Sequence, residues 1–141
     1  MSSSLPVVIG VVVAALAVAF VIGRVLTRRE GVLRSTEGVS FGGEVPELGL
    51  PAGRPAIVHF SAGWCGPCAG VRPVVDDVCA ELPAVTHVEI DMDANPSAAR
   101  QLSVMSLPTT FIFDGDGRQR YRSLGVPKAA DLRSALEPLL A

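Results

Sequence analysis

Cysteine, histidine and aromatic residues are scarce in this chain of 141 residues, which contains three Cys, two His and one Trp. Three cysteines are too few to hold a small fold together by disulfides. With only His59 and His87 to complete the set, they also make a poor group of metal ligands. A net charge of -2 gives no reason to expect a nucleic-acid partner. The length allows one folded domain of ordinary size.

Charged residues are also absent from Leu5 to Gly23, a run of 19 mostly apolar residues. A helix of that length spans roughly 28 Å, close to the thickness of the hydrocarbon core of a bilayer. We therefore expect a transmembrane helix over residues 5–23, preceded by a short tail of residues 1–4. A buried helix and a cleaved signal peptide are the alternatives, and the uncharged start of the chain favours an uncleaved anchor.

Arginines follow the apolar run and none precedes it: Arg24, Arg28, Arg29 and Arg34. This asymmetry favours a single-pass membrane protein whose C-terminal side lies in the cytoplasm. Residues 24–38, rich in glycine and charge, are expected to form a tether. The tether would lead through a short edge element into a folded domain at residues 39–141.

The pattern of the remaining chain predicts an α/β domain, a mixed β-sheet flanked by helices. Short apolar runs and alternation predict strands at residues 56–60, 87–91, 109–113 and 118–123. Apolar spacing of three and four predicts helices at residues 66–82, 96–102 and 128–140. The first strand, helix and strand would form a parallel pair, and the turn at residues 114–117 an antiparallel hairpin.

Two cysteines, Cys65 and Cys68, begin the first of these helices within the sequence FSAGWCGPC. Three positions apart on a helix, they lie on one face at a Cα separation that suits a disulfide. The positive end of the helix dipole stabilises a thiolate at Cys65, so we expect Cys65 to be the nucleophile. Cys68 lies one turn further in, shielded and placed to resolve a mixed disulfide on Cys65.

A non-catalytic binding module, in which the cysteine pair forms half of a zinc site, is a minor alternative. Zinc needs two further ligands, for which Cys79 and His59 are the nearest candidates. The order of elements places both in a core, so we expect Cys79 to be a packing residue and the chain to hold no metal.

The motif WCGPC, Pro73, the sequence SLPT at residues 106–109 and Gly125 together resemble the thioredoxin family over about 85 to 100 residues. The resemblance implies a thioredoxin-like fold and a disulfide oxidoreductase that acts on protein substrates. It implies a redox-active disulfide in place of a cofactor, and an electron donor of the thioredoxin reductase kind. The Gly-Pro pair between the cysteines is the form found in reducing members, which favours a reductase. An extracytoplasmic disulfide exchanger recharged by a membrane electron carrier is the alternative.

The resemblance also implies a substrate-binding surface around the cysteines. Leu107 and Pro108 would present backbone to an extended substrate segment, with Pro108 following a cis peptide bond. Trp64, beside the nucleophile, is suited to cover the disulfide and contact partners. Gly66 and Pro67, between the cysteines, would complete this surface.

Two positions depart from the family pattern. His59 stands where the family has a buried carboxylate, and Glu89 where it has a buried lysine in the next strand. We expect His59 to assist removal of the proton from Cys68, with Glu89 orienting His59 and raising its pKa. The alternative is a satisfied, partly buried pair with no kinetic role.

Overall fold

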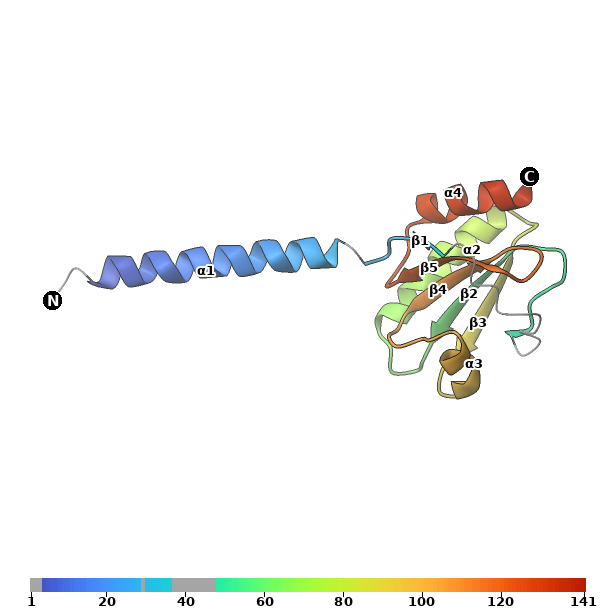
Figure 1. Cartoon of the computed structure of the whole chain (residues 1–141), viewed down its shortest axis with the longest axis horizontal. Coiled ribbons are helices and arrows are strands. Elements are labelled where there is room, and N and C mark those ends of the chain that lie inside the picture. Colours follow the sequence, from blue (N-terminus) through green and yellow to red (C-terminus); the bar gives the residue numbers. More distant parts are fainter. Residues whose placement is uncertain (1–3, 29, 37–47) are drawn as a thin grey trace. The chain divides into compact units, whose positions relative to one another are not determined.

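The computed structural model describes residues 4–28, 30–36 and 48–141 of the chain (Figure 1). Contacts divide the chain into two units, Met1–Glu30 and Gly31–Ala141. The first unit contains one helix, α1, Ser4–Thr27, which includes the expected apolar run and has no buried residue. Among the described residues α1 is the one helix long and apolar enough to cross a membrane, with a mean hydropathy of 3.0 over an 18-residue window. A signal sequence near the N-terminus would pass the same test.

Within the described residues, the second unit is a mixed five-stranded sheet with helices on both faces, which confirms the expected fold class. The strand order is β1-β5-β4-β2-β3; β2 and β3 are parallel and the other neighbours are antiparallel. The strands are β1 Arg34–Ser35, β2 Ala56–Ser61, β3 Thr86–Asp91, β4 Thr109–Phe113 and β5 Gln119–Leu124. The helices are η2 Pro67–Gly70, α2 Val71–Glu81, α3 Pro96–Gln101 and α4 Ala129–Leu140.

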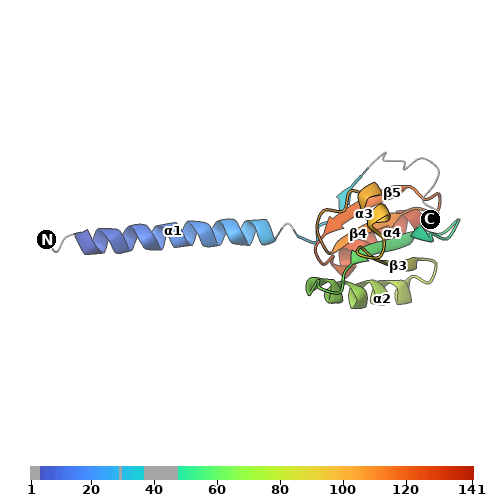
Figure 2. The same cartoon turned by 90° about the horizontal axis from the view of Figure 1, so that it is seen from below.

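Helices α2 and α4 cover one face of the sheet and α3 covers the other (Figure 1). Side chains alternate along β2: Ile57 packs with the α2 and α4 side, whereas Val58 and Phe60 pack with the α3 side. Because both faces are covered, β4 is buried along its whole length. Figure 2 shows α2 running along the β3 side of the sheet, where the two elements are in contact. Polar side chains on this face of β2 and β3 therefore lie beneath α2.

The helix expected over residues 66–82 is divided in the structure. Its first turn, η2, is a 3-10 turn in which the amide of Ala69 donates to the carbonyl of Gly66. Pro73 has no amide to donate to the carbonyl four residues earlier, so α-helical hydrogen bonding is interrupted there. The cysteine segment thereby forms a short turn of its own before α2 begins at Val71.

The sheet also gains an edge strand that the sequence pattern did not locate. Strand β1 lies within residues 24–38, expected to be a tether, and pairs with β5. The amide of Gly31 donates to the carbonyl of Leu124, with Gly31 at a φ of +79°. A Cβ at Gly31 would collide with the carbonyl oxygen of Val126, so glycine suits this approach. The compact unit thus begins at Gly31, whereas the expected domain start at Val39, like the tail residues 1–3, lies outside the described residues.

Candidate functional site

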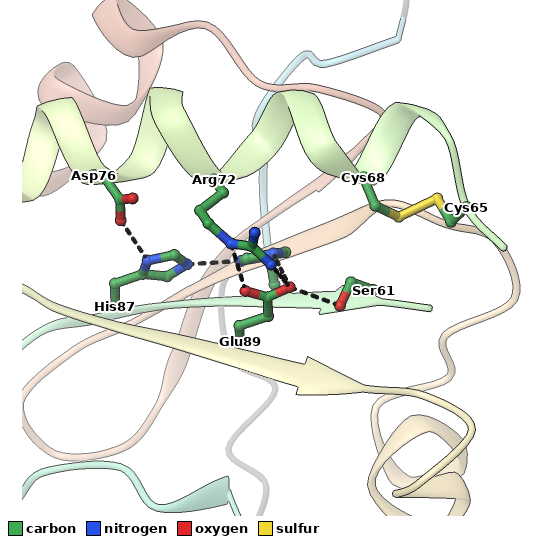
Figure 3. A network of polar contacts seen from close by, with 8 residues as sticks. Ser61, Cys65, Cys68, Arg72, Asp76, His87 and Glu89 are labelled. Carbon is green, nitrogen blue, oxygen red and sulfur yellow. Dashed lines mark hydrogen bonds and ion pairs between the residues drawn. A yellow bond between two sulfur atoms is a disulfide. The ribbon is translucent and has the colours of Figure 1, made fainter. Parts of the chain in front are cut away.

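Cys65 and Cys68 form a disulfide in the turn between β2 and α2, with a Cα separation of 5.5 Å. Cys65 is partly exposed, and its amide donates to the carbonyl of Ala62 just after β2. Cys68 lies in η2 and is only 6% exposed. The pairing confirms the expected disulfide. The two cysteines differ in environment, because Cys65 is partly exposed and Cys68 is buried. Figure 3 shows the bond that joins them.

The other residues that the resemblance assigned to the substrate-binding surface differ in exposure. Trp64 is 69% exposed, and its indole nitrogen donates to the Oδ2 atom of Asp93 at 3.0 Å. Leu107 is partly buried, and the peptide bond between Leu107 and Pro108 is cis, as the resemblance implied. Met105, which the sequence pattern did not single out, is 93% exposed two residues before Leu107. The exposure of an apolar side chain depends on the folded structure, so the sequence pattern gave no reason to single out this residue.

Beneath α2, two histidines and an aspartate form a line of hydrogen bonds. The Nδ1 atom of His59, on β2, lies 2.8 Å from the Nε2 atom of His87, on β3. The Nδ1 atom of His87 lies 3.0 Å from the Oδ1 atom of Asp76, on α2. The two imidazole rings are stacked, with centroids 4.9 Å apart. His87 is thus the hydrogen-bond partner of His59 at Nδ1, whereas Glu89, the residue expected to orient His59, lies near its Nε2 atom.

Glu89 is bound mainly by other groups. Both of its oxygens accept hydrogen bonds from the guanidinium of Arg72, at 2.8 and 3.0 Å, and Oε1 also accepts from Ser61 at 2.9 Å (Figure 3). The Nε2 atom of His59 is 3.5 Å from Oε1 of Glu89, too long for a strong hydrogen bond. The structure therefore brings His59 and Glu89 together, but Glu89 belongs chiefly to an ion pair with α2.

The interior position of His59 decides its charge. Burial of the imidazole, and next the neighbouring His87, lower the pKa of His59 to about 4. Glu89 acts in the expected direction and raises the pKa, but its effect is outweighed. The hydrogen bonds from Arg72 hold the pKa of Glu89 down at about 2 in spite of partial burial. At neutral pH the site therefore contains a neutral histidine beside an ionised glutamate.

Sequence reasoning missed the residues that hold His59 and Glu89 in place. Arg72 and Asp76 are four residues apart, so they lie on one face of α2. His87 and Glu89 are two residues apart on β3, so they point to one face of the sheet. Both spacings are visible in the sequence. What the sequence does not indicate is that the two faces meet.

Cys79 and the turn at residues 114–117 have the structural positions expected of a packing residue and of a hairpin turn. Cys79 is partly buried and packs against the core between the sheet, α2 and α4, and burial raises the pKa of its thiol. Asp114 accepts hydrogen bonds from the amides of Asp116 and Arg118, which closes the hairpin between β4 and β5. Among the described residues, no group of three His, Cys, Asp or Glu side chains is arranged to hold a metal ion.

A disulfide between a partly exposed and a buried cysteine, at the entry to a helix that covers a mixed sheet, defines a thiol-disulfide oxidoreductase. The family model for thioredoxin matches residues 39–138, which is more than half of the chain. The chain belongs to the thioredoxin family.

Relatives and solved structures agree with this assignment. Thioredoxin of Chlamydia trachomatis is 44% identical over 70 residues, which cover 50% of this chain and 68% of that protein. Thioredoxin of Mycolicibacterium smegmatis is 40% identical over 94 residues, 64% of this chain and 83% of the relative. Among solved structures, chloroplastic thioredoxin z superposes with a TM-score of 0.57 at 32% identity and covers 62% of this chain and 80% of its own.

The lowered pKa of His59 makes stability depend on pH. The folded state keeps His59 neutral down to about pH 4, whereas the unfolded chain binds this proton below about pH 6.5. Stability is therefore full above about pH 6.5 and falls as the pH drops toward 4, by at most about 3 kcal/mol from this group. Urea unfolding of the full chain in detergent, followed by circular dichroism between pH 7 and about 4.5, measures the loss.

Above about pH 4.5, the change in stability caused by His59 can be measured apart from the change caused by Glu89. The pKa of Glu89 is lowered to about 2, so its contribution is present above about 4.5 and disappears only at more acidic pH. The variant His59→Gln should show a flatter profile in this window, whereas Asp77→Asn, an exposed change on α2, should keep the slope. A wild-type profile that is flat from pH 7 to 4.5 would show that His59 is not held neutral.

Proposed function

We propose that this chain is a membrane-tethered protein-disulfide reductase in which Cys65 is the nucleophile and Cys68 the resolving cysteine. The observation that carries the proposal is the unequal burial of the two cysteine residues in one disulfide. A partner disulfide can approach the partly exposed Cys65. Cys68, packed against the interior, can reach Cys65 but not an incoming protein.

The reaction consists of two thiol-disulfide exchanges. In the reduced protein the Cys65 thiolate attacks one sulfur of the substrate disulfide, which forms a mixed disulfide and releases the other substrate sulfur as a thiolate. Cys68 then loses its proton and attacks the Sγ atom of Cys65. The second substrate thiolate leaves, and the Cys65–Cys68 disulfide remains. Two electrons pass from the protein to the substrate, and a donor must return them.

His59 is proposed to accept the proton of Cys68 in the second exchange. Its burial and its neutral imidazole support this role, because a neutral imidazole has one nitrogen free to accept a proton. Glu89 is proposed to support His59 by charge, since its Oε1 atom would be the nearest acceptor for a proton on Nε2. Removing the proton matters most for Cys68, because burial disfavours its thiolate.

The substrate-binding surface is proposed to consist of five residues around the disulfide. They are Trp64, Gly66, Pro67, Leu107 and Pro108. Trp64, Gly66 and Pro67 are exposed, and a side chain at Gly66 would meet nothing within 4 Å, so this side is open to a partner. An extended segment of the substrate would lie against the backbone of Leu107 and the apolar face of Trp64.

The direction of electron flow is proposed to be toward the substrate. The Gly-Pro pair between the cysteines supports a reductase, as in the reducing members that the motif resembles. A relative in Mycobacterium leprae is named bifunctional thioredoxin reductase/thioredoxin; it is 37% identical over 75% of this chain and 22% of its own length. The presence of both names in this relative supports an electron donor of the thioredoxin reductase kind for the present chain.

Helix α1 is proposed to be a membrane anchor with the catalytic unit on the cytoplasmic side. Its length of 24 residues, the mean hydropathy of 3.0 of its most apolar 18-residue window and its lack of buried residues support an anchor. Arg24 and Arg28, at the end of the apolar run, support a cytoplasmic location for the catalytic unit. A tether of this kind would keep the disulfide near membrane-bound substrates.

The roles of the two cysteines predict opposite behaviour of two serine variants. With insulin as a disulfide substrate, Cys68→Ser should accumulate a covalent complex through Cys65, because the resolving thiol is missing. Cys65→Ser should form none. Both should lose at least about 100-fold in turnover with a chemical reductant, while Cys79→Ser should keep it. Non-reducing gels and mass spectrometry identify the complex, and its accumulation in Cys65→Ser would reverse the assignment.

The reductase direction predicts a low reduction potential for the Cys65–Cys68 pair. Equilibration of the full chain with thiol buffers, followed by a count of free thiols, should give a value near or below about -250 mV. A value near about -150 mV would make the protein an oxidant or an isomerase and would place its exchange outside the cytoplasm. The variant Cys79→Ser should have the same potential, because Cys79 is not part of the pair.

The anchor predicts that the whole chain stays in the membrane. After expression in a bacterial host, the full-length mass should be found in a membrane fraction that resists alkaline carbonate. Protease added to spheroplasts should digest the catalytic unit only after lysis. A mature chain that begins near Gly23 would show a cleaved signal instead, and digestion before lysis would place the catalytic unit outside.

A further inference from the structure

The line from His59 through His87 to Asp76 runs from the interior to solvent. The exposed fraction of the side chain rises from 0% at His59 to 16% at His87 and 58% at Asp76. Hydrogen bonds of 2.8 and 3.0 Å join the three groups in that order. Figure 3 shows Asp76 and His87 on the α2 face of the sheet, with Cys68 further along the same helical segment. The three groups thus form a continuous connection out of the core.

The carboxylate of Asp76, at the outer end of the line, indicates which ring nitrogens carry protons. An exposed carboxylate at neutral pH only accepts hydrogen bonds, so Nδ1 of His87 donates to Asp76. The other nitrogen of His87, Nε2, is then placed to accept from Nδ1 of His59, and a neutral His59 has only one N–H group to give. Neutral His59 then carries no proton on Nε2. The opposite arrangement would place a bare nitrogen lone pair 3.0 Å from the carboxylate of Asp76.

The inner end of the line lacks a well-formed hydrogen bond. Nε2 of His59 is a buried side-chain atom without a hydrogen-bond partner in the described part of the chain, and Oε1 of Glu89 lies 3.5 Å from it. Buried polar atoms usually have a partner, and an exception calls for a reason. A nitrogen kept free to accept a proton during turnover is such a reason.

We propose that His87 and Asp76 are positioning residues for the resolving step, holding His59 with Nε2 free to take the proton of Cys68 and drawing the positive charge toward solvent. This inference rests on the proposed role of His59 as the base. When the Cys68 thiol gives its proton to Nε2, the proton on Nδ1 of His59 passes to Nε2 of His87. The charge then lies on His87, hydrogen-bonded to Asp76. When the disulfide is reduced again, Cys68 regains a proton by the reverse transfers.

The charges around His59 explain why an outward path is useful. The groups that act on its charge are His87 and Glu89 from β3 and Arg72 from α2, and its register partner on β4 is the neutral Thr110. Asp76 is joined to it through His87. Arg72 offsets the charge of Glu89 through two hydrogen bonds. Burial makes a lasting positive charge on His59 unfavourable, as its low pKa indicates. Asp76 is therefore the carboxylate placed to stabilise the positive charge on His87 after the charge has left His59.

The arrangement of protons can be measured directly, because His59 and His87 are the only two histidines of the chain. In the full chain, labelled with nitrogen-15 histidine and kept in detergent at about pH 7, the ring of His59 should carry one proton. His59 should be protonated on Nδ1, with a scalar coupling to Nε2 of His87 across the hydrogen bond. The variant His87→Gln assigns the signals. A proton on Nε2 of His59 in the wild type would overturn the proposal.

A kinetic assay separates the roles of His59 and of the positioning pair. With reduced protein in excess over dithiobis(nitrobenzoate), the first release of thionitrobenzoate reports attack by Cys65 and the second reports attack by Cys68. A Cys79→Ser background leaves only these two thiols. At about pH 6.5 to 7, His87→Gln and Asp76→Asn should slow the second phase relative to the first by about tenfold. Asp77→Asn, the same change one position further along α2, should leave both phases unchanged.

The pH profile distinguishes positioning from a structural defect. At strongly alkaline pH, hydroxide removes the thiol proton without a protein base, so the variants should converge on the wild-type second phase. A deficit that persists at high pH, or no deficit at pH 7, would refute the role of His87 and Asp76. If His59→Gln slows the second phase but these two variants do not, the base role stands and the inference fails. If His59→Gln has no effect either, the proposed base role fails as well.

Discussion

The parallel register between β2 and β3 is the constraint on which the site depends. It places His59 opposite Glu89 and His87 opposite Ile57, one row earlier. Because residues of the same parity point to one face, all three polar side chains face α2. Helix α2 then supplies Arg72 and Asp76 to Glu89 and His87 from the side of the helix that lies over this row. A shift of one residue in this register would turn His59 toward the α3 face and separate the network.

Burial explains how charge is distributed in the site. The sheet is covered on both faces, so His59 lies where an ion would be poorly solvated. The ions are placed further out, in the pair of Arg72 with Glu89 and at the partly exposed Asp76. The site thus combines a neutral interior with a charged rim. Such an arrangement favours a group that binds a proton briefly over one that carries a permanent charge.

Much of the fold could be predicted from local pattern. The apolar run that forms β4 and the spaced leucines of α4 bury the residues that their periods indicated. The pattern failed at β1, whose two residues Arg34 and Ser35 are both exposed and held by backbone pairing alone. It also failed at the start of the cysteine helix, since a 3-10 turn and an α-helical turn bury similar positions over so few residues.

The sequence by itself determined the disulfide and the apolar helix, because each depends on residues that lie close together along the chain. It also indicated that His59 and Glu89 would meet, since both lie on adjacent predicted strands. Only the tertiary structure decided that His59 is held by His87 and Asp76 while Glu89 is bound by Arg72. These contacts join three elements, so they follow from strand register and from the position of a helix over the sheet. The periodicity of the sequence determines neither the strand register nor the position of the helix.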